Sequence, residues 1–388
     1  TTVKAYAAQE PKGAAVQKHA MTTLITQTAP IANNTHGGRA KCLQRLVRLD
    51  LPVPRTVALP FDTVLDIARG QTPDIQKIAD EFPHDALLCV RPSSQDPDWG
   101  GPGAVVNIGM NDARYEFYCA QMGEGPASAL YTRFVQSYAV NIARLDPDMF
   151  DDVVGDGCEA LEASLRAYAL ETEESFPQDR VTQLTAVLSS MARAWEGTSA
   201  RLLRQAKGAP ADAGLGLVVQ QMVFGVGTGL CGSGVLQLVD STTGLPQITG
   251  RYLSQSQGRD ALQNDADAMF LTRDPRGPSL EEHAPEAFET LTQHAALMRQ
   301  RLRAEMQLEF VISDGELFIL DGVRVARSSR AAVRIAVALA DEGIISREEA
   351  LMRVQPRTLT ELLHRQVDPR AKRDVIGRGI AASPGAAT

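Results

Sequence analysis

The sequence contains no run of about twenty apolar residues, the length that an α-helix needs to cross a bilayer. Its first ten residues, Thr1–Glu10, lack the basic stretch followed by an apolar stretch that is typical of a secretory signal. These two absences predict a cytoplasmic protein without a membrane partner.

Cysteine is scarce and scattered, and no C-x-x-C pair is present. An odd number of widely spaced cysteines does not form a disulfide framework, and isolated thiols lack the spacing of a zinc site. We therefore expect reduced, buried thiols. The five cysteines are Cys42, Cys89, Cys119, Cys158 and Cys231.

An excess of positive charge is also missing. The chain has 39 Lys and Arg residues against 47 Asp and Glu residues, a net charge of −8. General nucleic-acid binding needs a basic surface, so the charge balance argues against nucleic acid as a partner. An anionic ligand would need a local group of cations or backbone N–H donors. With 388 residues, 44% of them hydrophobic, the chain can build a sizeable core in two or three domains.

The first half of the chain changes from a strand pattern to a helical one. The apolar run at 86–90 (ALLCV) predicts a buried strand that ends at Arg91-Pro92. From Asp112 to about Gly208 the apolar residues recur at the three-to-four residue spacing of helices, interrupted at 176–179.

The second half returns to strand patterns. Apolar runs at 217–224 and 235–239 predict two strands, with a cluster of glycines between them. Asp314-Gly315 lies between the runs 308–312 and 317–320, which is a strong hairpin signal. The pattern as a whole predicts a mixed α and β fold.

Several strings follow one another in the order of one known family. From about residue 36 to the C-terminus, the chain resembles the nucleotide-binding part of the pyruvate, phosphate dikinases. The strings are Gly37-Gly38-Arg39-Ala40, Leu51-Pro52-Val53-Pro54, Val90-Arg91, Asn107-x-Gly109-x-Asn111-Asp112, Phe176-Pro177-Gln178, Val219-Gln220-x-Met222-Val223-Phe224-Gly225, Glu309-Phe310 and Arg330 to Ala336.

The resemblance implies a bipartite ATP-grasp-like fold of the α/β (α+β) class, with a helical insertion and C-terminal linker helices. The expected parts are a tail (1–20), a first ATP-grasp-like subdomain (21–112), a helical subdomain (113–212), a second ATP-grasp-like subdomain with the nucleotide cleft (213–327) and linker helices (328–388).

The resemblance also implies ATP and Mg²⁺ as cofactors. In the family, a phosphate passes from ATP to a histidine on a swivelling domain, which then phosphorylates pyruvate. The phosphohistidine string and the pyruvate-binding barrel are not found in this sequence. The implied partners are a nucleotide and either a separate histidine domain or a regulatory partner protein.

Two arginines are the candidates for phosphate binding and, by resemblance, for catalysis. Arg39 follows the Gly-Gly turn, where the family has a lysine that reaches the phosphates; the alternative is a solvated charge beside the turn. Arg91 ends the predicted buried strand, where an arginine needs an anion or a carboxylate as partner.

Glu309 and Asp321 stand at the places of the family's two metal ligands, and two carboxylates can bind Mg²⁺. The turn between them decides whether they face one ion. With a two-residue turn at Asp314-Gly315, residue 309 pairs with residue 320 and Asp321 faces the opposite side. With a three-residue loop through Glu316, residue 309 pairs with Asp321 and both carboxylates face one side.

Two further strings are candidates for nucleotide binding. Gln220, Gln221, Met222 and Val223 match the hinge that holds adenine through backbone groups and apolar contacts; the alternative is a plain core strand. Gly232, Ser233 and Gly234 match a glycine loop whose backbone N–H groups cradle phosphate.

The chain also departs from the family at charged positions. Arg251 and Arg259 stand where the family has glutamates, and Val323 stands where it has an arginine, with Arg324 one place later on the opposite face of a strand. Such reversals oppose the binding of Mg·ATP. The first hypothesis is therefore a non-catalytic relative, an ATP-binding scaffold or regulatory protein. The alternative is an active half-enzyme that donates phosphate to a histidine on another chain or on a removed C-terminal part.

Overall fold

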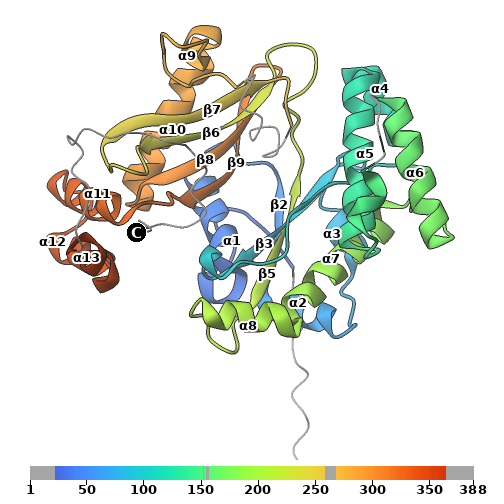
Figure 1. Cartoon of the computed structure of the whole chain (residues 1–388), viewed down its shortest axis with the longest axis horizontal. Helices are drawn as coiled ribbons and strands as arrows, with labels where there is room; N and C mark the ends of the chain where they lie inside the picture. Colours follow the sequence, from blue (N-terminus) through green and yellow to red (C-terminus); the bar gives the residue numbers. More distant parts are fainter. Residues whose placement is uncertain (1–21, 152, 154–156, 258–267, 364–388) are drawn as a thin grey trace, which may run out of the picture.

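The chain is built around two antiparallel sheets (Figure 1). The structure, a computed structural model, describes residues 22–363 apart from 152, 154–156 and 258–267. The expected tail, Arg259 and the part of the expected linker region after residue 363 lie outside the described residues. The mixed α+β class is confirmed, and two antiparallel sheets fit an ATP-grasp-like fold.

The first sheet has five strands, and every neighbouring pair in it is antiparallel. In spatial order they are β1 (Thr23–Leu24), β2 (Thr56–Leu59), β5 (Leu215–Gln221), β3 (Leu88–Ser94) and β4 (Val105–Ile108). The central strand β5 follows the helical region in sequence. The expected division at residue 213 therefore assigns a strand of the first sheet to the second subdomain; the subdomain boundaries remain a prediction.

The second sheet has four strands in the order β7 (Pro246–Ser254), β6 (Gly232–Val239), β8 (Met306–Ser313) and β9 (Glu316–Arg324). The predicted hairpin is confirmed, because Ser313 pairs with Glu316 around Asp314-Gly315. Both turn residues have positive φ, 50° at Asp314 and 83° at Gly315. A two-residue turn of this kind matches the twist of the flanking strands and favours Asp-Gly.

The predicted helical region is confirmed. It consists of α4 (Asp112–Met122), α5 (Glu124–Asn141), α6 (Cys158–Thr172), α7 (Arg180–Glu196) and α8 (Thr198–Ala206), with a 3₁₀ turn at Pro147–Phe150. The expected interruption at 176–179 separates α6 from α7. Together with α2 (Phe61–Ala68) and α3 (Ile75–Ala79), helices α4 to α7 share one hydrophobic core with the first sheet. In Figure 1 they lie on the side of the molecule away from the second sheet.

Helix α1 (Asn33–Arg48) connects the two sheets. It packs against β3 and β5 of the first sheet and against β9 of the second, and Figure 1 shows it between them. Its apolar face belongs to a second core that also contains α10 (Pro285–Leu302) and the second sheet. Helix α1 therefore brings side chains next to both sheets.

The chain after the second sheet forms α11 (Ser329–Asp341), α12 (Arg347–Arg353) and α13 (Pro356–Leu363). A small separate core, with Ile335 and Leu339 among its members, holds α11 and α12 together. Figure 1 places the three helices beside the second sheet, on the side opposite α4–α6. Their expected role as linkers stays a prediction.

Three local expectations need correction. Strand β3 does not end at Arg91-Pro92 but continues to Ser94, because its pairing with β5 extends beyond its pairing with β4, which stops at Val90. Pro92 thus lies beside an open edge, where a missing N–H is tolerated. Strand β5 ends at Gln221 rather than continuing to Phe224. The five cysteines are free as expected, but three of them are only partly buried.

None of the helices within the described residues combines the length and the hydropathy needed to cross a bilayer.

Candidate functional site

The candidate site lies where α1, β3 and the β8–β9 hairpin meet. The structure brings together the four charged residues that the sequence proposes for phosphate and metal binding: Arg39 from α1, Arg91 from β3, Glu309 from β8 and Asp321 from β9. Each arginine is more than 200 positions from its acidic partner, 282 for Arg39 and Asp321 and 218 for Arg91 and Glu309. We call these four residues the charge quartet.

A turn inside α1 places Arg39. Gly37 interrupts the helical backbone with φ 83° and ψ 171°, so the predicted glycine turn is confirmed. A Cβ at this position would lie 1.8 Å from the carbonyl oxygen of Ser93, which excludes other residues. The hydroxyl of Ser93 donates to the His36 carbonyl at 2.7 Å and accepts from the Ala40 N–H at 3.0 Å. Strand β3 thereby satisfies the backbone groups that the turn leaves open.

Arg39 is held on two sides. Its Nε donates to Asp321 Oδ2 at 2.7 Å, and its Nη1 donates to the carbonyl of Pro92. Its side chain is 25% exposed, whereas that of Asp321 is 5% exposed. The alternative of a solvated charge beside the turn is therefore wrong, since Arg39 is committed to a buried carboxylate.

Arg91 bridges both carboxylates. Its Nη1 and Nη2 lie 3.1 and 3.3 Å from the two oxygens of Glu309, a two-pronged contact, and Nη1 also lies 3.7 Å from Asp321 Oδ2. Burial lowers the pKa of Arg91, but Glu309, then Cys89 and then Asp321 together outweigh this and raise it. For Asp321, burial raises the pKa, but the charges of Arg39 and Arg91 more than offset this and hold that pKa below its ordinary value.

A β-bulge in the β8–β9 hairpin brings the two carboxylates into register. Neither of the two turn geometries considered from the sequence includes a bulge. The turn has two residues, yet Glu309 is paired with Asp321, because the register shifts by one position between Glu309 and Phe310. Phe310 pairs with Ile319, so Leu320 is the extra residue. The expectation that a two-residue turn sends Asp321 to the opposite face is therefore wrong, and no three-residue loop is needed.

Gln220 stabilises this bulge, a role that sequence reasoning missed. Its side chain is buried in β5, and its Nε2 donates to the carbonyl of Leu320 at 3.3 Å and to Thr56 Oγ1 at 3.1 Å. The contact joins the first sheet to the bulge of the second. The one available signal was a polar residue inside an apolar strand, since a buried amide needs partners.

The rest of the predicted hinge is also engaged within the chain. The Met222 N–H donates to the Leu87 carbonyl at 2.9 Å. The Gln257 amide donates to the Val223 carbonyl at 3.0 Å and accepts from the Gly225 N–H at 2.7 Å. Adenine would have to compete with Gln257 for this acceptor and donor. The adenine-binding roles of Gln220, Gln221, Met222 and Val223 stay predictions.

The predicted glycine loop is a strand instead. Gly232, Ser233 and Gly234 form the start of β6 and pair with β7 on one side and with β8 on the other. A Cβ on Gly234 would lie 2.4 Å from the ring of Phe310, so this glycine makes room for a ring. The true loop lies between β5 and β6. A phosphate-binding role for the three residues stays a prediction.

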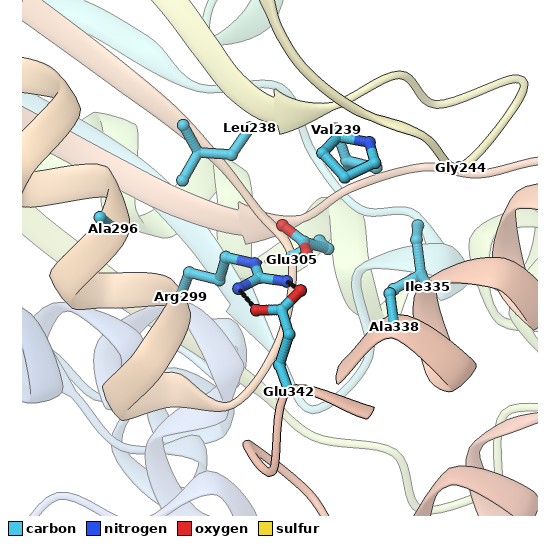
Figure 2. Close-up of a pocket in the computed structure, with 10 residues that line it drawn as sticks. Leu238, Val239, Gly244, Ala296, Arg299, Glu305, Ile335, Ala338 and Glu342 are labelled. Carbon is cyan, nitrogen blue, oxygen red and sulfur yellow. Dashed lines mark hydrogen bonds and ion pairs between the residues drawn. The ribbon is translucent and has the colours of Figure 1, made fainter. Parts of the chain in front are cut away.

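A cavity of about 260 Å³ lies apart from the quartet, between the second sheet, α10 and α11. Figure 2 shows Arg299 at its centre, directed toward Glu342 with Glu305 close by. The guanidinium lies 2.6 Å from Glu305 and is bound by both oxygens of Glu342. This triad attaches α11 to the end of α10 and is a structural contact.

The charge quartet is neutral as a group and its members use one another as partners. Among the described residues, no three His, Cys, Asp or Glu side chains come together to hold a metal ion. The two carboxylates that the resemblance assigns to Mg²⁺ face one side, but both are bound by arginines. In this arrangement the residues do not fit the ion.

The chain thus has a mixed α+β fold that fits an ATP-grasp-like architecture, with a charged centre whose members pair with one another. No family model matches the chain. It is 29% identical to pyruvate, phosphate dikinase from Rhizobium meliloti and 27% identical to that from Clostridium symbiosum, in each case over 91% of this chain and 44% of the relative. It is 28% identical to the chloroplastic enzyme from Flaveria trinervia over 78% of this chain and 33% of the relative.

The predicted resemblance is confirmed: the chain is a relative of the pyruvate, phosphate dikinases. It spans less than half the length of these relatives.

Proposed function

We propose that this chain is a non-catalytic relative of the nucleotide-binding part of pyruvate, phosphate dikinases, and that it works as a scaffold or regulatory protein. The observation that carries the proposal is the charge quartet. The two cations that would hold phosphates and the two carboxylates that would hold Mg²⁺ neutralise one another.

Mg·ATP would have to separate the ion pairs of the charge quartet. Arg91 would leave Glu309 and Asp321, which lie 3.1 and 3.7 Å away, and Asp321 would also be separated from Arg39, now at 2.7 Å. Breaking a buried ion pair costs about 3–5 kcal/mol when a charge is left without a partner. The phosphates and the ion would have to replace all of these contacts at once, which lowers the free energy available for binding Mg·ATP.

The departures from the family act in the same direction. Arg251 lies on β7, where the resemblance implies a glutamate, and Arg39 stands in place of the family's lysine. An arginine forms two-pronged contacts with a carboxylate, whereas a lysine acts as a point charge. Arg39 is thus suited to the ion pair with Asp321 that the structure contains.

The test is an assay for turnover of Mg·ATP, with and without a histidine domain supplied from an active relative. We expect no release of AMP or ADP above background. Turnover at the level of an active relative would refute the proposal. Thermal shift with ATP, with and without Mg²⁺, separates a nucleotide-binding scaffold from a protein that binds no nucleotide: we expect any stabilisation by ATP to be independent of Mg²⁺.

The alternative is an active half-enzyme that phosphorylates a histidine on another chain. One observation favours it: the four residues that the resemblance assigns to phosphate and metal lie together, so the quartet would be a resting state that Mg·ATP opens. A charge-restoring variant distinguishes the two functions. If the quartet and the charge reversals block activity, Arg39→Lys combined with Arg251→Glu gains Mg-dependent ATP binding; in an active half-enzyme, the wild type already has it.

A further inference from the structure

A second cavity, of about 490 Å³, is lined by six arginines: Arg45, Arg48, Arg301, Arg303, Arg324 and Arg353. We call it the arginine basin. Among the described residues, no aspartate or glutamate lines it. In a chain with a net charge of −8, this is a strong local concentration of positive charge.

The basin is assembled from elements far apart in the sequence. Arg45 and Arg48 stand in the last turn of α1, and Arg301 stands in the last turn of α10. Arg324 is the last residue of β9 and is exposed, one position after the half-buried Val323. The displaced arginine that the sequence singled out thus belongs to the basin and not to the charge quartet.

The arginines differ in how far they are already engaged. Arg303 and Arg353 both pair with Glu349 of α12, and Arg48 Nε donates to the Gln27 carbonyl at 2.7 Å. Within the described part of the chain, the side chains of Arg45, Arg301 and Arg324 form neither a hydrogen bond nor an ion pair. Three guanidinium groups therefore keep their donors available at one cavity.

The negative charge at the two helix C-termini is too small to neutralise the arginines of the basin. A helix C-terminus carries about half a negative charge, and α1 and α10 both end here. Glu349 supplies the ion pairs to the basin arginines among the described residues. About four positive charges therefore remain uncompensated. These positive charges also act on a neighbouring side chain. The pKa of Lys41 is lowered, first by burial and then by the charges of Arg48 and Arg45.

We propose that the arginine basin binds a small metabolite that carries several phosphate groups. Guanidinium groups bind phosphate oxygens in pairs, which makes arginine the preferred residue for such ligands. A volume of about 490 Å³ lies within the range of small-molecule sites and exceeds the need of a single phosphate. Leu49 and Leu302 add apolar surface for a carbon skeleton. The basin is separate from the charge quartet, so the proposal does not depend on the proposed function.

The test is calorimetric titration of the full chain with inorganic tripolyphosphate at low and at physiological salt. We expect one site per chain, with affinity that falls as salt rises. Replacing the three unpaired arginines together (Arg45→Ala, Arg301→Ala, Arg324→Ala) should weaken binding more than tenfold. The matched control is Arg69→Ala, an exposed arginine at the C-terminal end of α2, which should bind like the wild type.

Stability separates a binding role from a structural one. If the three arginines are there for a ligand, the triple variant without ligand is as stable as the wild type or more stable, because mutual repulsion is relieved. A lower thermal midpoint for the variant would assign the arginines to the helix ends and overturn the proposal. Equal affinity in wild type and triple variant would also overturn it, as would binding of a glutamate-rich peptide as tight as that of tripolyphosphate. If the triple variant does not fold, Arg45→Glu alone should still weaken binding.

Discussion

Arg91→Ala is the most direct test of the internal pairing of the charge quartet. The change removes both contacts to Glu309 and the longer contact to Asp321, while Arg39 still pairs with Asp321. Glu309 is left as a largely buried carboxylate without a cation. Breaking a fully buried ion pair costs about 3–5 kcal/mol. Because the side chains of Arg91 and Glu309 are 13% and 20% exposed, we expect about 2–3 kcal/mol.

The measurement is urea unfolding followed by circular dichroism at neutral pH. The matched control is the double variant Arg91→Ala with Glu309→Gln, which removes both charges and should recover a large part of the loss. A loss below about 0.5 kcal/mol in the single variant, the size of an exposed pair, would show that Arg91 does not hold the carboxylates.

Three other changes test the parts that support the site. Gln220→Leu removes the amide that binds the bulge carbonyl and should cost about 1–3 kcal/mol in urea unfolding; a cost near zero would leave the bulge without this support. Gly234→Ala should cost about 1–3 kcal/mol by overpacking against the ring on β8, whereas Gly103→Ala, which meets nothing within 4 Å, should be neutral; equal costs would contradict the packing. Asp321→Asn should make the free energy of unfolding less dependent on pH in the acidic range. The pKa of Asp321 is depressed in the fold, so its contribution is present above the unfolded value of about 3.9 and is lost as the pH falls through the lower folded value; an unchanged pH dependence in the variant would refute this.

Local sequence patterns predicted most of the secondary structure correctly. The Asp314-Gly315 hairpin, the Gly37 turn and the helices between Asp112 and Gly208 follow from backbone preferences and apolar spacing, which act over a few residues. The wrong predictions concern segments whose structure is set by the strands that pair with them. Strand β3 continues through Pro92 because β5 extends beside it, and residues 232–234 form a strand because β7 and β8 flank them.

The candidate site was predicted as a set of residues but not as an arrangement. Resemblance pointed to Arg39, Arg91, Glu309 and Asp321, and the structure places all four together. Their mutual pairing could not be read from the sequence, because it depends on α1 lying between two sheets. The bulge at Leu320 was equally hidden, since it depends on register and on the amide of Gln220.

The sequence by itself determined the charged groups that this protein has available and the strands and helices that carry them. Only the tertiary structure decided which charges meet. Ion pairing falls off within several ångströms, and the partners here are separated by more than 200 positions along the chain. The same packing that places Arg39 beside Asp321 places Arg324 in the arginine basin and not in the charge quartet.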